Sequence, residues 1–202
     1  MGKTGRKNKV HSAEFKICAI IDMREHHLGY SETVLKYWDI TKGQEQNYKN
    51  TVIRRERQMK IIPFDKEYRD DMIFMILEAK NALGRVPGLN DDLLDIQKAY
   101  FDKGDMFWIA LDEKSRVIGS VGYSTNVNPD EVTLHRLFVK YNLKHQGIGT
   151  ALLETAENHI KQQGKCAIYV HLGDREQWYE SHKFYPKHGY IEYKENYMKK
   201  EI

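Results

Sequence analysis

The chain has 202 residues, a formal net charge of +3 and 41% hydrophobic residues, so it can bury one good core and still carry a small appendage. No apolar run approaches the roughly 18 to 20 residues that span a bilayer, and no segment resembles a signal peptide. We therefore expect a soluble, cytoplasmic protein that makes no membrane contact.

Cysteine and charge divide the possibilities further. Cys18 and Cys166 are isolated and the nine histidines show no ligand spacing, so we expect neither a disulfide framework nor a metal site, and we expect Cys166 to be a small core residue. Residues 1–60 hold 13 Lys or Arg against 7 Asp or Glu, a net charge of +6, whereas residues 61–202 hold 19 against 22, a net charge of −3. We therefore predict a basic helical segment over residues 1–58 and a separate domain over 59–202.

Three short helices are predicted in the amino-terminal segment, after a basic arm that we expect to be flexible. Ser12 and Ser31 are suitable N-caps that precede apolar residues at the helical period, and a third helical stretch begins near Asn50. This order resembles the helix-turn-helix head of insertion-sequence transposases, on residues 12–16, 30–32 and 50–55. The likeness implies a DNA-binding head, and the alternative is a helical appendage with no DNA target. The side chains that would contact phosphates are Arg54, Arg55 and Arg57. No carboxylate catalytic domain of a transposase follows, so transposase activity is excluded.

The second domain reads as a mixed α/β domain with a mostly antiparallel sheet. We predict strands over residues 60–64, 106–111, 117–123, 132–139, 166–172 and 190–198, and helices over residues 66–79, 90–100, 148–164 and 175–185. The second helix is capped by Asn90 or Asp91, and a loop with Gly84, Pro87 and Gly88 precedes it. The helix after residue 148 provides one parallel crossover.

Residues 131–164 are the most informative run, because a buried strand enters a glycine loop that opens into an amphipathic helix. Unpaired amides and the helix dipole at such a helix start favour a phosphate or pyrophosphate. A Walker A loop would need a Lys-Ser or Lys-Thr pair after Gly149, where the chain has Thr150 and Ala151. A dinucleotide loop would need a third glycine where Leu152 stands. The Walker A loop is therefore excluded, and the dinucleotide loop is a poor fit to these residues.

Three ordered signatures resemble the GNAT superfamily of acyl-CoA-dependent N-acyltransferases: residues 134–139, the loop 144–149 and residues 184–190. The resemblance covers residues 59–202 and implies the GNAT fold with acetyl-CoA as co-substrate and no metal. It places pantetheine along β-strand residues and the pyrophosphate on loop amides. The cofactor-binding residues that it implies are Leu137, Phe138, Val139, Lys144, Gln146, Gly147, Ile148, Gly149 and Thr150. Lys144 stands where the family usually has Arg or Gln, and it keeps the charge but loses planar geometry.

The resemblance also suggests catalytic residues. Tyr185 occupies the position of a tyrosine that protonates the leaving thiolate, although it could instead be a core aromatic. The amide of Leu137 or Phe138 would polarise the thioester carbonyl. A glutamate that often acts as the base aligns with Thr133, which leaves Glu131 and His135 on the same strand face as alternative bases.

The acyl acceptor is an amine of a small molecule or a protein that the sequence does not identify. The loop over residues 81–90 would line its site. Glu78, Asp91, Asp92 and Asp95 could favour a cationic amine, or they could be solvated helix starts. Trp178 replaces an asparagine common in the family. Two functions remain: an N-acetyltransferase that works by direct attack in a ternary complex, or a DNA-binding regulator that senses acyl-CoA without turnover. A homodimer is also left open.

Overall fold

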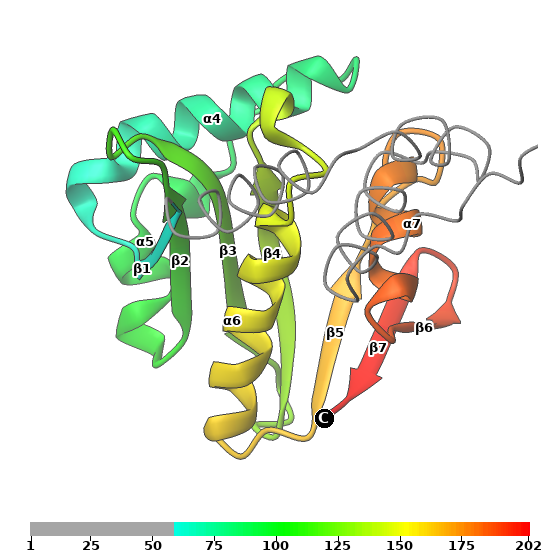
Figure 1. Cartoon of the computed structure of the whole chain (residues 1–202). Helices are drawn as coiled ribbons and strands as arrows, with labels where there is room; N and C mark the ends of the chain where they lie inside the picture. The colour runs from blue at the N-terminus through cyan, green and yellow to red at the C-terminus, as the bar shows by residue number, and fades with distance from the viewer. Residues whose placement is uncertain (1–58) are drawn as a thin grey trace, which may run out of the picture. The chain divides into compact units, whose positions relative to one another are not determined.

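Seven strands form one mixed sheet in the computed structural model, which describes residues 59–202 (Figure 1). The strands are β1 (Lys60–Pro63), β2 (Met106–Leu111), β3 (Val117–Thr125), β4 (Glu131–Val139), β5 (Ala167–His171), β6 (Ile191–Lys194) and β7 (Tyr197–Glu201). Their order across the sheet is β1-β2-β3-β4-β5-β7-β6, and only the β4–β5 pair is parallel. The predicted mixed, mostly antiparallel sheet is therefore confirmed.

Helices cover both faces of the sheet. They are α4 (Arg69–Ala82), α5 (Ile96–Ala99), α6 (Ile148–Gln162) and α7 (Tyr179–Lys187), with 3-10 turns at Lys66–Tyr68, Asp91–Leu93, Phe101–Lys103 and Tyr141–Leu143. One buried cluster joins α4 and α5 to the sheet, and a second cluster joins α6 and α7 to the opposite face (Figure 1). The glycine at position 119 of β3 lets α6 approach closely, because a Cβ there would lie 2.7 Å from Leu152 Cδ1. We call the sheet face covered by α4 and α5 the α4 face, and the sheet face covered by α6 and α7 the α6 face.

The strongest local patterns predicted their elements well. The β2–β3 hairpin falls where it was expected, and α6 begins at Ile148 directly after the glycine loop. Gly164 has a φ of +73°, the left-handed conformation that commonly follows a helix end, as its position in the sequence predicted. On α4, the side chains of Met72, Met75 and Ile76 are buried, as their spacing indicated.

Two predicted helices are shorter than expected. The helix predicted over residues 90–100 is interrupted, because Asp95 takes an extended conformation and its carboxylate accepts a hydrogen bond from the Lys98 amide, which starts α5 anew. The helix predicted from residue 175 begins only at Tyr179. Before it, the Asp174 carboxylate binds the amides of Glu176 and Gln177 and so holds a turn.

The carboxyl-terminal strand and Cys166 were predicted wrongly. The single strand expected over residues 190–198 is a β6–β7 hairpin, in which Asn196 turns the chain with a φ of +63°. Cys166 is exposed and not a core residue. It precedes β5, and its backbone amide binds Asp130 O at 2.8 Å while its side chain faces outward.

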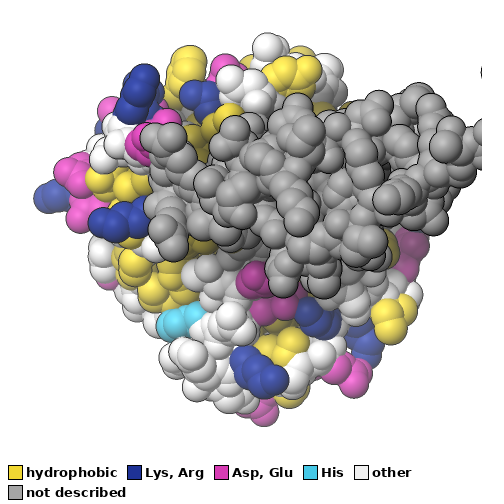
Figure 2. Space-filling view, in the orientation of Figure 1, with side chains coloured by type: hydrophobic (Ala, Val, Ile, Leu, Met, Phe, Trp, Pro, Cys, Tyr) yellow, Lys and Arg dark blue, Asp and Glu magenta, His cyan; other side chains and the backbone are white. Residues whose placement is uncertain are grey.

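Residues 59–202 form one compact unit. On the face drawn in Figure 2, basic and acidic side chains are interspersed over the described residues. The basic arm, the helix-turn-helix segment and Cys18 lie outside the described residues, so the domain boundary and the DNA-binding head remain predictions.

Candidate active site

The strands β4 and β5 separate halfway along β4. They pair only from Glu131 with Ala167 to Leu134 with Val170, and the strands diverge beyond that point (Figure 1). From residue 135 to 139, β4 keeps β3 as a partner but has no paired strand on its other side among residues 59–202. Backbone groups on that open edge are free to bind an extended ligand as an added strand would.

A β-bulge at Arg136 sets which amides face the open edge. Arg136 has a φ of +55°, and the β3–β4 register shifts between Ser120 and Gly122. Beyond the bulge the Lys140 amide donates to Ile118 O at 2.9 Å, so alternation in an antiparallel ladder directs the amide of Phe138 toward β3. The amides of Leu137 and Val139 therefore face the open edge.

The glycine loop ends beside this edge, at the start of α6. Gly147 takes a left-handed conformation with a φ of +80°, and no side chain caps the helix. The backbone amides of Gln146, Gly147, Ile148, Gly149 and Thr150 have no hydrogen-bond acceptor within the described part of the chain. The helix start therefore presents a row of free donors with the positive end of the helix dipole behind them.

Lys144 connects the loop to α7. Its ammonium binds Glu180 Oε2 at 2.7 Å and lies 5.5 Å from the centre of the Tyr141 ring. Gly149 lies near the same elements, because a Cβ there would lie 3.5 Å from Val139 Cγ2 and 3.6 Å from Phe184 Cε2. These contacts fix the glycine loop against the end of β4 and against α7.

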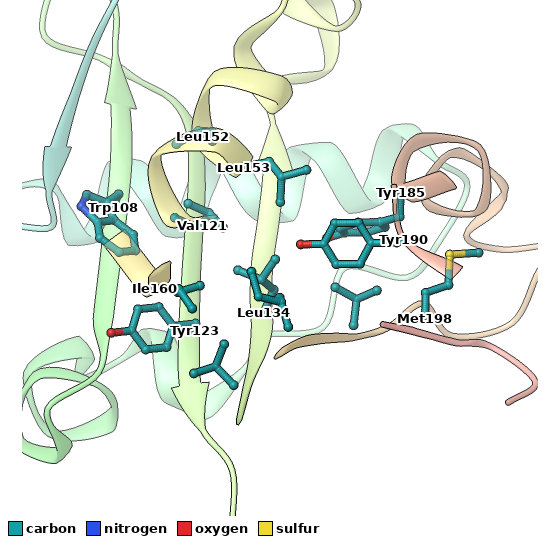
Figure 3. Close-up of a cluster of buried hydrophobic side chains, with 14 of the residues drawn as sticks. Trp108, Val121, Tyr123, Leu134, Leu152, Leu153, Ile160, Tyr185, Tyr190 and Met198 are labelled. Carbon is teal, nitrogen blue, oxygen red and sulfur yellow. The ribbon is translucent and has the colours of Figure 1, made fainter. Parts of the chain in front are cut away.

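Tyr185 lies in the buried cluster of the α6 face (Figure 3). It is 7% exposed, and its ring meets the rings of Phe184 at 5.3 Å and Tyr190 at 5.1 Å, each edge to face. Within residues 59–202, its hydroxyl makes no hydrogen bond. Burial, assisted by the nearby Glu157 carboxylate, raises the pKa of Tyr185 above the ordinary tyrosine value. Tyr185 is therefore protonated at neutral pH.

His135 lies at the last residue before the bulge. Its Nε2 is 2.7 Å from Ser124 Oγ, and burial together with the positive charge of Arg136 lowers the pKa of His135 below the ordinary value. The imidazole is therefore neutral near pH 7. Glu131 lies four residues earlier, about 13 Å along the strand, on the part of β4 that is paired on both sides.

One ionic network at the site could not be predicted from residue spacing. The Arg136 guanidinium donates two hydrogen bonds to the Asp92 carboxylate, from Nη2 to Oδ1 at 2.7 Å and from Nε to Oδ2 at 3.0 Å. The Tyr100 hydroxyl donates to Asp92 Oδ2 at 2.6 Å. Asp92 is thereby neutralised, and Asp95 caps α5. Two of the four carboxylates that could have favoured a cationic amine are therefore already engaged within the fold.

Residues 59–202 contain neither a membrane-spanning helix nor a cluster of metal ligands. No helix there is long and apolar enough to cross a membrane. Nor do His, Cys, Asp and Glu side chains in that range form a group of three or more that could hold a metal ion.

A strand that opens beyond a bulge lies beside a helix start with free amides, and this arrangement can be compared with known proteins. Residues 103–192 match the family model described as the acetyltransferase (GNAT) domain. The matched region, 90 of the 202 residues, contains all three signatures that resembled this superfamily.

Relatives at the sequence level match only part of the chain. The probable N-acetyltransferase camello of Xenopus tropicalis is 33% identical over 82 residues, which is 40% of this chain and 37% of the relative. N-acetyltransferase 8 of Homo sapiens is 32% identical over 87 residues, 41% of this chain and 38% of the relative. The match thus spans less than half the length of these relatives.

Solved structures confirm the fold over a longer range. A GNAT family acetyltransferase from Staphylococcus aureus Mu50 is similar with a TM-score of 0.63 at 23% identity, over 71% of this chain and 98% of that chain. The PaiA N-acetyltransferase of Thermoplasma acidophilum, solved with coenzyme A, is similar with a TM-score of 0.55 at 20% identity, over 71% of this chain and 99% of that chain. The described unit therefore has the GNAT fold.

Proposed function

We propose that this protein is an N-acetyltransferase that transfers the acetyl group of acetyl-CoA to a primary amine by direct attack in a ternary complex. The observation that carries the proposal is the open edge of β4 beside the free amides of the α6 start. Similar folds from Thermoplasma acidophilum and Brucella melitensis were solved with coenzyme A and acetyl-CoA, which supports the same co-substrate here.

In this proposal the free amides of residues 146–150 bind the pyrophosphate, where the helix dipole favours negative charge. Pantetheine then lies along the open edge and pairs with backbone groups of Leu137 and Val139. The Leu137 amide is the donor that polarises the thioester carbonyl, because the Phe138 amide faces β3. The alternatives for this donor, Leu137 or Phe138, thereby reduce to Leu137.

The acid and the base lie on opposite faces of the sheet. Tyr185 belongs to the cluster of the α6 face, on which the glycine loop opens. His135 shares its strand face with Glu131 and Thr133, and it points away from Val132 and Leu134, which are buried on the α6 face. An amine that enters from the α4 face therefore meets His135, while the leaving sulfur remains on the side of Tyr185.

The proposed reaction transfers two protons while one bond forms and one bond breaks. His135, neutral at pH 7, accepts a proton from the amine, directly or through a water. The nitrogen attacks the carbonyl carbon, the new C–N bond forms and the C–S bond breaks. Tyr185 gives its proton to the departing thiolate. Glu131 is the second candidate for the base, at about 13 Å farther along the strand.

The test is a thiol-release assay with acetyl-CoA and a panel of primary amines. The proposal predicts amine-dependent release of free coenzyme A and an acetylated amine detected by mass spectrometry. Tight binding of acetyl-CoA without transfer to any amine would instead favour the regulator that senses acyl-CoA. That second function also needs the predicted DNA-binding head, so replacing Arg54 and Arg55 by Ala would have to weaken DNA binding and its salt dependence.

A further inference from the structure

Arg85 is a partly exposed cation of the described unit whose guanidinium has no hydrogen-bond partner there. The nitrogen atoms Nε, Nη1 and Nη2 of Arg85 are shielded from solvent, and none of them makes a hydrogen bond. The guanidinium lies over the ring of Trp178, with its carbon 3.4 Å from the ring centre. A guanidinium has five donors, and leaving buried donors unsatisfied is costly. A ligand that supplies acceptors would remove that cost.

The position of Arg85 is on the acceptor side of the proposed active site. Its platform Trp178 packs with the cluster of the α4 face, and the ring of Trp178 lies 6.3 Å from the ring of Phe138. Phe138 belongs to the open part of β4. The start of α6, where the pyrophosphate is proposed to bind, belongs to the opposite face. Arg85 therefore lies toward the α4 face, from which the amine is proposed to enter, although Glu180, whose charge acts on Arg85, also holds Lys144 of the glycine loop.

The surroundings hold Arg85 in place before any ligand binds. Lys80 is buried, and its ammonium donates to Gly88 O at 2.6 Å and to Asn90 Oδ1 at 2.5 Å, which fastens the loop that carries Arg85. The indole of Trp178 packs closely against the backbone of Gly173, where a Cβ would lie 2.7 Å from the indole, and this packing limits its movement. A fixed guanidinium loses little freedom when it binds an anion.

Charge around Arg85 is unbalanced. Burial, followed by the positive charges of Arg136 and Arg85, lowers the pKa of Lys80. Glu180, the acidic side chain whose charge acts on Arg85, already binds Lys144, and Asp92, whose charge acts on Lys80, already binds Arg136. Lys80 is occupied by its two oxygen acceptors. Arg85 is left without an acidic hydrogen-bond partner in the described unit, so its charge would be balanced by a ligand with one negative charge.

We propose that the acyl acceptor is a small amine that carries a carboxylate, such as an amino acid, and that Arg85 binds this carboxylate while stacked on Trp178. The planar fork of Arg matches the planar carboxylate with two parallel hydrogen bonds. The proposal rests on the proposed function and names its substrate class. It also replaces the cationic acceptor that the acidic residues near α5 could have favoured.

The experiment compares matched substrates on the full chain. Common α-amino acids, their primary amides and the corresponding decarboxylated amines are assayed with acetyl-CoA by thiol release. The acids should be acetylated with a kcat/KM about 10- to 100-fold above that of the neutral analogues, in keeping with charge-assisted hydrogen bonds. Arg85→Met, which keeps an apolar stem over Trp178, should raise KM for the acids by a similar factor and leave KM for acetyl-CoA unchanged.

Two further readouts separate recognition from folding. Calorimetry with coenzyme A present should show that the acid binds Arg85→Met about 10- to 100-fold more weakly than wild-type protein. The Tm of the free variant should stay close to that of wild type, because loss of the cation–π contact with Trp178 is offset by removal of unsatisfied donors and no hydrogen bond is lost. Arg69→Met is the matched control, since Arg69 is half exposed and pairs with Asp70 on the surface.

The outcomes are distinct. If amides or decarboxylated amines react as well as the acids, the carboxylate inference is wrong while the acetyltransferase proposal stands. If Arg85→Met instead raises KM for acetyl-CoA, Arg85 serves a phosphate of the co-substrate and the inference is also wrong. If no amine of any kind releases thiol, the proposed function fails and the acceptor class fails with it.

Discussion

Tyr185→Phe removes one buried hydroxyl and keeps the ring. Because that hydroxyl makes no hydrogen bond within residues 59–202, its loss breaks none, and the ring contacts with Phe184 and Tyr190 can persist. We expect the free energy of unfolding to change by less than about 0.5 kcal/mol. If the hydroxyl protonates the leaving thiolate, kcat should fall by roughly 10²- to 10⁴-fold with little change in KM for acetyl-CoA.

Tyr190→Phe is the matched control, because it makes the same chemical change in the same cluster. The Tyr190 hydroxyl donates to Glu157 Oε1 at 2.9 Å, so its removal should lower stability by about 1 to 2 kcal/mol while kcat is maintained. Denaturant unfolding and steady-state kinetics with a confirmed acceptor measure both effects. Wild-type kcat in Tyr185→Phe would refute the acid role and assign Tyr185 to the core alone.

Three other perturbations test the rest of the account. His135→Gln should remove the acidic limb of the pH profile of kcat/KM, whereas Glu131→Gln should retain that limb. The limb should lie below the ordinary histidine pKa, because burial and the charge of Arg136 lower the pKa of His135. The reverse result for the two variants would make Glu131 the base. Asp92→Asn should lower stability by about 1 to 3 kcal/mol at pH 7 in chemical unfolding. Burial alone would raise the pKa of Asp92, but hydrogen bonds from Arg136 and Tyr100 lower this pKa in the folded state. The stabilisation by Asp92 is therefore present above its unfolded-state pKa and is lost as the pH falls through its folded-state pKa. A stability difference between Asp92→Asn and wild type that persists at low pH would contradict this. A chain that starts at Met59 should fold and bind acetyl-CoA, as circular dichroism and calorimetry can show, and an insoluble product would contradict the boundary.

Local patterns predicted the parts of the fold that depend on neighbouring residues. The β2–β3 hairpin and α6 follow from strand and helix periods with clear turn residues between them. The β6–β7 turn was missed because it contains neither glycine nor proline, and Asn196 supplies the positive φ instead. The exposure of Cys166 was missed because an apolar run does not reveal where a strand begins.

The site was predictable only where one segment forms it. The free amides of the glycine loop lie within five consecutive residues, and the order of strand, loop and helix indicated them. The pair of Arg136 with Asp92 joins residues 44 positions apart, and Arg85 meets Trp178 across an even longer separation. Such contacts depend on how α4 and α7 meet the sheet, and no period or spacing in the sequence encodes them.

The central claim is that acetyl-CoA binds at the glycine loop. Isothermal titration with acetyl-CoA should compare the wild-type chain with Gly147→Glu and Gly164→Glu. Both glycines have a positive φ, +80° and +73°, and lie at opposite ends of α6, so the two variants add the same strain and the same charge. We predict that wild type and Gly164→Glu bind acetyl-CoA and that Gly147→Glu does not, because its carboxylate would occupy the place of the pyrophosphate. Equal binding by Gly147→Glu and Gly164→Glu, or no binding by the wild-type chain, would contradict the account.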